Sequence, residues 1–159
     1  MIAAVAARDP DILALQEVTP SSAETLGTEL PKISLPHVLA SFVVAPAWEA
    51  AAPRRCGLVI ASRWPAASRT FDSGAPWPER ILSGELASPA GAFTLHTTHI
   101  PPGSSNGEVK IQVLEAVLNV VAATAPAAQI LCGDFNVPQV ETVDARIVTW
   151  RERIPEVVT

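Results

Sequence analysis

The sequence predicts a single α/β domain, residues 1–159, that is rich in antiparallel strands. Between residues 56 and 99, four apolar segments are each short enough for a strand, and Pro or Gly residues separate them. A run of short strands with such connections favours antiparallel pairing. Hydrophobic residues at 48% and charged residues at 17% are typical of a globular chain, and the 15 prolines predict many loops.

The N-terminal part is expected to alternate helix and strand. Residues 2–7 are compatible with a helix, which Asp9-Pro10 ends, and the apolar run 12–15 predicts a buried strand. Ser21 and Glu24 have capping-box spacing in a helix from Pro20 to about Leu30. The next expected strands are Val38 to Val44, Cys56 to Ser62, Ala67 to Asp72, Arg80 to Leu86 and Ala92 to His99, with a loop at residues 45–55.

The C-terminal part is expected to begin with a long helix. Ser105 and Glu108 form a second capping box, and the helix is expected to run to about Ala123. Its apolar residues follow helical spacing and predict one buried face: Val109, Val113, Leu114, Val117, Leu118 and Val121. A short buried strand is predicted from Gln129 to Cys132, and the weakly patterned tail allows a helix around Asp144 to Glu152.

Charge, cysteine content and the lack of long apolar segments indicate which partners and which cellular location to expect. The net charge of -5 argues against a protein that grips long nucleic acid through a basic face. Cys56 and Cys132 lack metal-ligand spacing and are interpreted as small core residues. No segment is long enough to cross a membrane and no signal peptide is seen, so a cytoplasmic location is expected, with secretion left open if the true N-terminus is missing. No obligate protein partner is evident.

Two acidic motifs lie far apart in the sequence, DILALQEV at 11–18 and ILCGDFNVP at 130–138. Each places a carboxylate, Glu17 or Asp134, at the end of an apolar run, where a strand fixes a side chain beside a loop. In extended backbone, Asp134 and Asn136 would point the same way. The alternatives are an ordinary exposed charge for Glu17 and an ordinary Asp/Asn turn after a strand.

Two histidines lie close together in the segment LHTTH at 95–99. Strand alternation places His96 and His99 on opposite faces, so they are not expected to act together. His96 is interpreted as structural.

Four segments in order resemble the endonuclease/exonuclease/phosphatase superfamily of DNase I-like phosphoesterases. They are the two acidic motifs, GLVIASRWP at 57–65 and FTLHTTHIPPG at 93–103. The resemblance implies two mostly antiparallel sheets packed as a sandwich with helices outside. It also implies hydrolysis of a phosphoester, in nucleic acid, a lipid headgroup or a small phosphate ester, with Mg²⁺ or, as an alternative, Mn²⁺.

The resemblance also implies residue roles. Glu17 would bind the metal, Asp134 would orient or deprotonate the attacking water, and Asn136 and His99 would hold the phosphate. Arg63 and Lys110 are further phosphate-binding candidates. The alternative for Arg63 is that it anchors a loop through hydrogen bonds.

Two parts of the superfamily's pattern have no counterpart in the sequence. Met1 lies within the helix of the first motif, where the superfamily has an upstream strand ending in Asn, and no Asp-His pair follows Asn136. The expectation is therefore a domain that lacks both terminal elements, whose activity is in question. The alternative function is a non-catalytic remnant or a partner-binding homologue of the same fold.

Overall fold

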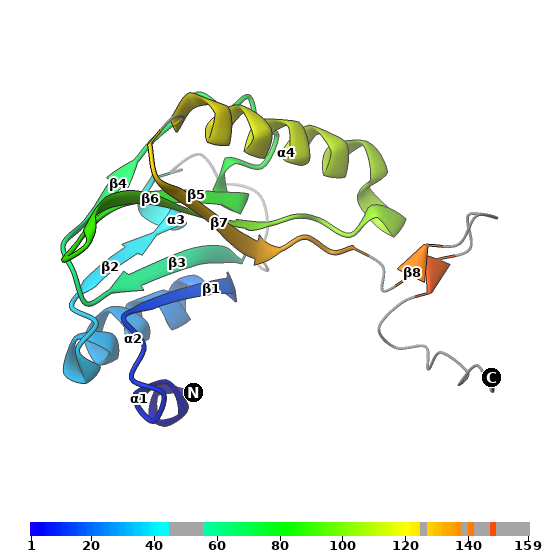
Figure 1. The fold of residues 1–159 in the computed structure, drawn as a ribbon. Coiled ribbons are helices and arrows are strands. Elements are labelled where there is room, and N and C mark those ends of the chain that lie inside the picture. Colours follow the sequence, from blue (N-terminus) through cyan, green and yellow to red (C-terminus); the bar gives the residue numbers. More distant parts are fainter. Residues whose placement is uncertain (45–55, 125–126, 138–139, 142–146, 149–159) are drawn as a thin grey trace, which may run out of the picture.

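Two sheets face each other in the computed structural model, and helices cover both outer faces (Figure 1). The structure describes residues 1–44, 56–124, 127–137, 140–141 and 147–148. Sheet A has the order β1 (Ile12–Val18), β3 (Gly57–Ser62) and β2 (His37–Ala40). Sheet B has the order β4 (Ala66–Arg69), β5 (Ile81–Ser88), β6 (Gly91–His99) and β7 (Gln129–Asp134).

The pairing confirms the predicted, mostly antiparallel sandwich. Neighbouring strands of sheets A and B are antiparallel, except that β6 and β7 are parallel. The parallel pair is possible because the long helix α4 (Gly103–Thr124) makes the crossover between these two strands. Two short strands, β8 (Val140–Glu141) and β9 (Ile147–Val148), form a separate antiparallel pair.

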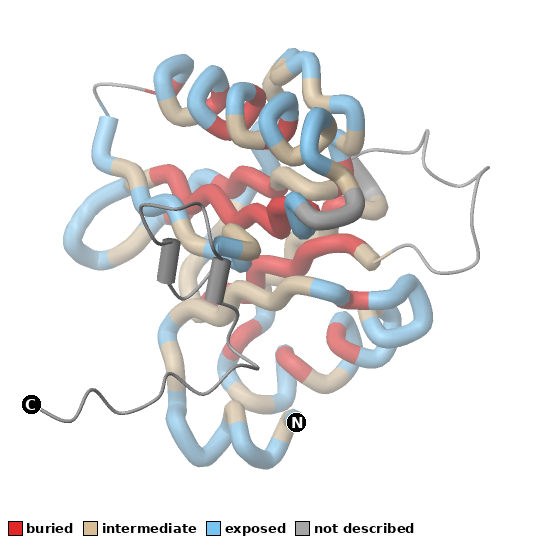
Figure 2. The backbone as a smooth tube through the Cα atoms, turned by 90° about the vertical axis from the view of Figure 1, so that its right-hand side faces the viewer, coloured by how far each residue is buried: buried red, intermediate tan, exposed pale blue. Residues whose placement is uncertain are grey.

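The core lies on both sides of β3, whose residues are all buried. Leu58 and Ile60 pack against sheet B, while Val59 and Ala61 pack against the helices below sheet A. This strand therefore has apolar residues on both faces rather than an alternating pattern, as expected for a strand between two packed layers. Figure 2 shows the buried strands at the centre and the exposed helix surfaces outside.

Helices close the two outer faces. Below sheet A lie α1 (Ile2–Ala6), α2 (Pro20–Glu29) and the short 3-10 helix η1 (Leu30–Ile33), and Leu26 and Leu30 from this layer are buried against β3. Above sheet B, α4 buries Val113 and Val117 against Ile100. No helix among the described residues is both long and apolar enough to span a membrane.

Local details of the N-terminal half correct two predictions. The cap of α2 is Thr19, whose hydroxyl accepts a hydrogen bond from the backbone N–H of Ser22 at 3.2 Å, so the predicted capping box does not form. Strand β2 ends at Ala40 and the short helix α3 (Ser41–Val44) follows it. The reason is the buried Ser41, whose hydroxyl accepts a hydrogen bond from the backbone N–H of Leu58 at 2.9 Å and fixes this turn.

The C-terminal half differs from prediction in burial. Leu118 is 68% exposed, and Val120 takes the buried place expected for it. Strand β7 exists but is not buried, because Ile130 and Leu131 remain exposed. In place of the tail helix, Ile147–Val148 forms β9, and the rest of that segment and the predicted loop at 45–55 lie outside the described residues.

Candidate active site between the two sheets

Glu17 lies at a break in the alternation of β1. Leu13 and Leu15 face the helix layer below sheet A, so regular alternation would direct Glu17 into the same apolar layer. The pairing of β1 with β3 shifts between Leu15 and Val18, and Glu17 has a left-handed φ of 57°. A bulge of this kind moves one side chain to the other face of the strand.

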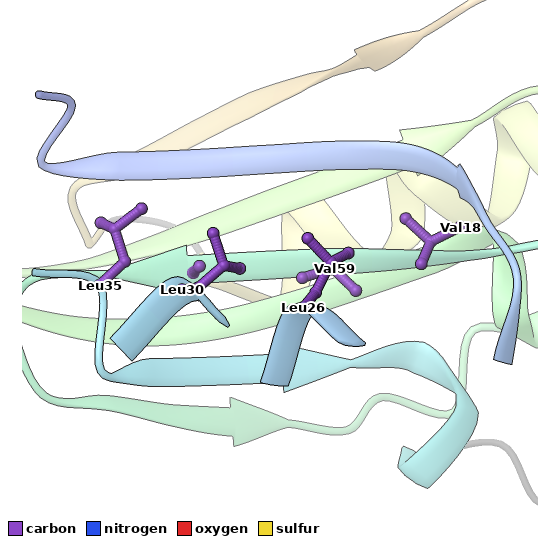
Figure 3. Packing of buried hydrophobic residues seen from close by; sticks show 6 residues of the cluster. Val18, Leu26, Leu30, Leu35 and Val59 are labelled. Atoms are coloured by element: carbon purple, nitrogen blue, oxygen red, sulfur yellow. The ribbon is translucent and has the colours of Figure 1, made fainter. Parts of the chain in front are cut away.

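The bulge explains how a charged residue is tolerated beside a buried one. Val18 takes the inward position and is only 6% exposed, packed with Leu26 and Val59 in the cluster shown in Figure 3. The side chain of Glu17 is 72% exposed instead. A positive φ in a non-glycine residue is uncommon, and such backbone is concentrated at functional sites.

His99 ends β6 on the face that looks toward sheet A. Phe93 and Leu95, on the same face of the strand, pack in the core between the sheets, and Thr97 accepts a 3.0 Å hydrogen bond from Gln16 of β1. His99 itself is nearly buried, and its Nε2 lies 3.7 Å from Oε1 of Glu17 and 3.9 Å from Oδ2 of Asp134. Three strand ends from two sheets therefore meet at one imidazole nitrogen.

The protonation of His99 follows from its neighbours. Burial lowers the pKa of His99, and the positive charge of Arg80 lowers it further, while Glu17 and Asp134 act in the opposite direction. Arg80 NH1 contacts Nδ1 of the ring. Because a guanidinium can only donate, Nδ1 is the acceptor, and the proton of the neutral ring lies on Nε2. The N–H of His99 thus faces the two carboxylates.

Asp134 is brought to His99 by the parallel register of β6 and β7, in which these two residues are partners. Gly133 allows this close approach: its φ is 143°, and a Cβ at this position would lie 2.0 Å from the carbonyl oxygen of Thr98. Only glycine is compatible with that contact. The carbonyl of Asp134 also accepts a hydrogen bond from the backbone N–H of Ile100 at 2.8 Å, which joins the two strand ends.

Asn136 lies in a turn rather than in extended backbone, which corrects the predicted geometry. Its φ is 45°, and its backbone N–H donates to Oδ1 of Asp134 at 2.8 Å, an arrangement typical of an Asx turn. Its side-chain amide donates to the carbonyl of Ile100 at 2.6 Å, and Lys110 donates to the carbonyl of Asn136 at 2.8 Å. Asp134, Asn136 and Lys110 are therefore neighbours, joined through this turn.

The donors at this place suit a hard cation bound by few protein ligands. Among the described residues, no three His, Cys, Asp or Glu side chains gather closely enough to hold a metal by themselves. Mg²⁺ commonly uses one or two carboxylates and completes its shell with water and substrate phosphate. The exposed carboxylates of Glu17 and Asp134 fit that pattern, whereas a closed structural zinc site would need more nitrogen or sulfur ligands.

His96 occupies the opposite face of β6, as strand alternation predicts. Its Nδ1 lies 2.8 Å from the hydroxyl of Ser83 and its Nε2 lies 3.3 Å from the hydroxyl of Thr124 on α4. Burial lowers the pKa of His96. A small cavity of about 90 Å³, lined in part by Ser83 and Val120, lies on this side of sheet B and not beside Glu17.

Arg63 lies apart from the other candidate residues, and its contacts agree with the alternative interpretation, that it anchors a loop. It follows Ser62, the β3 partner of Ile12, and so lies at the opposite end of β1 from Glu17, roughly 17 Å away at the usual rise per strand residue. Its guanidinium donates to Asp11 at 2.9 Å and to Asp9 at 2.7 Å. The two carboxylates raise the pKa of Arg63, and the residue anchors the loop before β1.

From the sequence, Arg80 is a weaker candidate than Arg63 or Lys110 and carries no assigned role, although the sequence contains a signal for its position. The hairpin of β5 and β6 pairs Ser88 with Gly91 across a two-residue turn. Counting outward from that turn places Arg80 opposite His99. Register counting of this kind requires the turn to be known, and the composition of the segment alone does not supply it.

Sequence comparison places the chain in a family. The profile of the Endonuclease/Exonuclease/phosphatase family matches residues 1–154. The chain belongs to this family. No curated protein matches it in sequence.

Several solved structures share the fold of this chain, although their sequence identity to it is low. An AP endonuclease from Archaeoglobus fulgidus has a TM-score of 0.67 and 23% identity, covering 86% of this chain and 51% of the endonuclease. D. rerio TDP2, solved with a single-strand DNA product, has a TM-score of 0.62 and 17% identity, with coverages of 85% and 51%. ANGEL2, described as a 2',3'-cyclic phosphatase, has a TM-score of 0.57 and 19% identity, with coverages of 88% and 44%. The chain thus spans about half the length of these proteins.

Proposed function

We propose that this chain provides the catalytic site of a Mg²⁺-dependent phosphoester hydrolase, with Mn²⁺ as an alternative metal. The observation that supports this most is the convergence of Glu17 and Asp134, from different sheets, on Nε2 of His99 at 3.7 and 3.9 Å. Membership of a family of nucleases and phosphatases agrees with it. A fold alone does not define an activity, so the proposal depends on these side chains.

The contacts of Glu17, Asp134 and His99 suit three different roles in hydrolysis. Glu17 would hold the metal, which when bound stabilises the negative charge that develops on a phosphate. Asp134 uses Oδ1 to accept from the backbone of Asn136, which leaves Oδ2 to orient or deprotonate a water molecule. His99 would donate its Nε2–H to a phosphate oxygen.

Asn136 and Lys110 complete the proposed phosphate site. An amide nitrogen carries two N–H groups, and Ile100 accepts one from Asn136, so that among the described residues a second remains for a phosphate oxygen. Lys110 binds the backbone carbonyl of Asn136 and thereby adds a positive charge to the same turn. Asn136 would donate a hydrogen bond to a phosphate bound at this turn, and Lys110 would attract its negative charge.

The proposed substrate is a phosphoester. The related structures are named for activity on nucleic acid or on a cyclic phosphate. A phosphoester in nucleic acid, a lipid headgroup or a small phosphate ester would each present the same group to this site. The net charge of -5 favours a short substrate over long duplex DNA. A cytoplasmic location is part of this proposal.

The direct test is hydrolysis of bis(p-nitrophenyl) phosphate, a diester, and p-nitrophenyl phosphate, a monoester, with Mg²⁺ and with EDTA. We expect Mg²⁺-dependent release of nitrophenol, which Glu17→Gln lowers by roughly 10²- to 10³-fold, the loss typical of removing one electrostatic stabiliser. Glu24→Gln, an exposed glutamate on α2, is the matched control and should leave the rate unchanged. Equal rates in wild type and Glu17→Gln would show that Glu17 has no part in the reaction. If neither wild type nor the variants hydrolyse a substrate, the non-catalytic alternative is favoured.

A further inference from the structure

Arg80 contacts the side of the His99 ring that faces away from the carboxylates. It ends the 3-10 helix η3 (Pro78–Arg80), and the next residue, Ile81, pairs with Thr98 of β6. Its NH1 meets Nδ1 of His99, whereas Nε2 of the same ring faces Glu17 and Asp134. The imidazole is thus held between a cation and two anions.

Three further contacts fix Arg80 itself. Its backbone N–H donates to the carbonyl of Trp77 at 3.0 Å, and its own carbonyl accepts from the hydroxyl of Thr98 at 2.9 Å. Its guanidinium carbon lies 5.8 Å from the centre of the Trp77 ring, within the range of a cation–π contact. The guanidinium therefore approaches His99 from a constrained direction.

One atom of Arg80 has no partner of its own. Its Nε is buried without a hydrogen bond among the described residues. An unpaired buried donor costs free energy, and such groups in folded proteins call for an explanation other than stability. The contact of the same guanidinium with His99 offers that explanation.

We infer that Arg80 is a positioning residue that keeps the proton of neutral His99 on Nε2, the nitrogen that faces Glu17 and Asp134. A carboxylate beside Nδ1 would have the opposite effect, because it would accept a hydrogen bond from Nδ1–H, keep the proton on Nδ1 and leave Nε2 as an acceptor. The arginine therefore makes His99 a hydrogen-bond donor toward the space between the strand ends. The importance of that donor for phosphate binding rests on the proposed function, but the tautomer can be measured without it.

The experiment is a long-range ¹⁵N–¹H NMR spectrum of the histidine rings at a pH where they are neutral. The chain has three histidines, and His99 is assigned by its loss in His99→Ala. Wild type should show a protonated Nε2 and an unprotonated Nδ1. Arg80→Met, which keeps the length of the side chain but removes every donor, should give a mixture of tautomers, and Arg80→Lys, which keeps a donor, should restore the wild-type pattern.

Two controls separate this effect from a general loss of structure. Arg69→Met removes another arginine of sheet B, which stacks on Phe71 at 5.5 Å and lies 3.7 Å from Glu85, so it should not alter the His99 pattern. The signals of His96, held by Ser83 and Thr124, should remain the same in both Arg80 variants.

The rate of hydrolysis gives a second measurement, independent of the NMR spectrum. With the diester substrate, Arg80→Met should lower kcat by roughly 10- to 100-fold, as expected when a supporting partner of a site residue is removed, and Arg80→Lys should recover much of it. A proton on Nδ1 in wild type, or an unchanged tautomer in Arg80→Met, would overturn the inference. If wild type does not hydrolyse the substrate, the proposed function fails, while the tautomer of Arg80→Met still decides the role of Arg80.

Discussion

His96 and His99 lie three residues apart on one strand, and both have a pKa lowered mainly by burial, yet their surroundings differ. His96 faces the hydroxyls of Ser83 and Thr124 beneath α4. His99 faces one cation and two carboxylates at the open ends of the strands. Burial alone therefore does not distinguish a structural histidine from a candidate site residue, whereas the charge and exposure of its partners do.

The largest expected difference between the two histidines is in the rate of hydrolysis after each is replaced by alanine. His99→Ala should lower diester hydrolysis by roughly 10²- to 10³-fold, because it removes a donor aimed at the phosphate. His96→Ala should leave the rate of the folded protein within a few-fold of wild type. The measurement is kcat at saturating Mg²⁺ for both variants, normalised to the folded fraction. A similar loss in both variants would mean that the two faces do not differ in function.

The second expected difference is in stability, and here His96→Ala should have the larger effect. His96→Ala removes a fully buried ring and takes the imidazole partner from the hydroxyl of Ser83, while Thr124 keeps its hydrogen bond to Gln129, so we expect a loss of about 1–3 kcal/mol in the free energy of unfolding. His99→Ala should lose less, because its carboxylate neighbours are exposed to water and Arg80, which loses its contact with Nδ1, keeps its cation–π contact with Trp77. Urea unfolding of both variants measures the difference. A larger loss in His99→Ala would reverse the assignment of the structural histidine.

The succession of antiparallel strands could be predicted from the sequence, because strand length and the intervening Pro and Gly residues are local signals. The packing of two sheets into a sandwich followed only from the resemblance to a family. The opposite faces of His96 and His99 followed from alternation alone. The bulge at Glu17 could not be predicted, because it depends on how β1 pairs with β3 and on the apolar layer that accepts Val18. The placement of Arg63 also depends on tertiary structure, since Asp9 and Asp11 become its partners only when β1 and β3 pair.

The smallest expected effect is on how the free energy of unfolding depends on pH. Because burial lowers the pKa of folded His96 below 6.5, the unfolded chain binds a proton more readily as the pH falls through that value. The free energy of unfolding should therefore be highest at neutral pH and should decrease below pH 6.5, before carboxylates titrate. The decrease should be shallower in His96→Ala. An equal slope in wild type and this variant would show that His96 titrates alike in the folded and unfolded states.

The central claim is that the ends of β1, β6 and β7 form one cation site beside His99 and apart from His96 and His37. Paramagnetic broadening by Mn²⁺ tests this directly, because it depends steeply on distance from the bound ion. In a titration followed by NMR, we predict that the ring signals of His99 broaden first, that those of His37 persist, and that Glu17→Gln abolishes the selectivity while Glu24→Gln preserves it. Uniform broadening of all three histidines, or selective broadening that survives Glu17→Gln, would contradict the account.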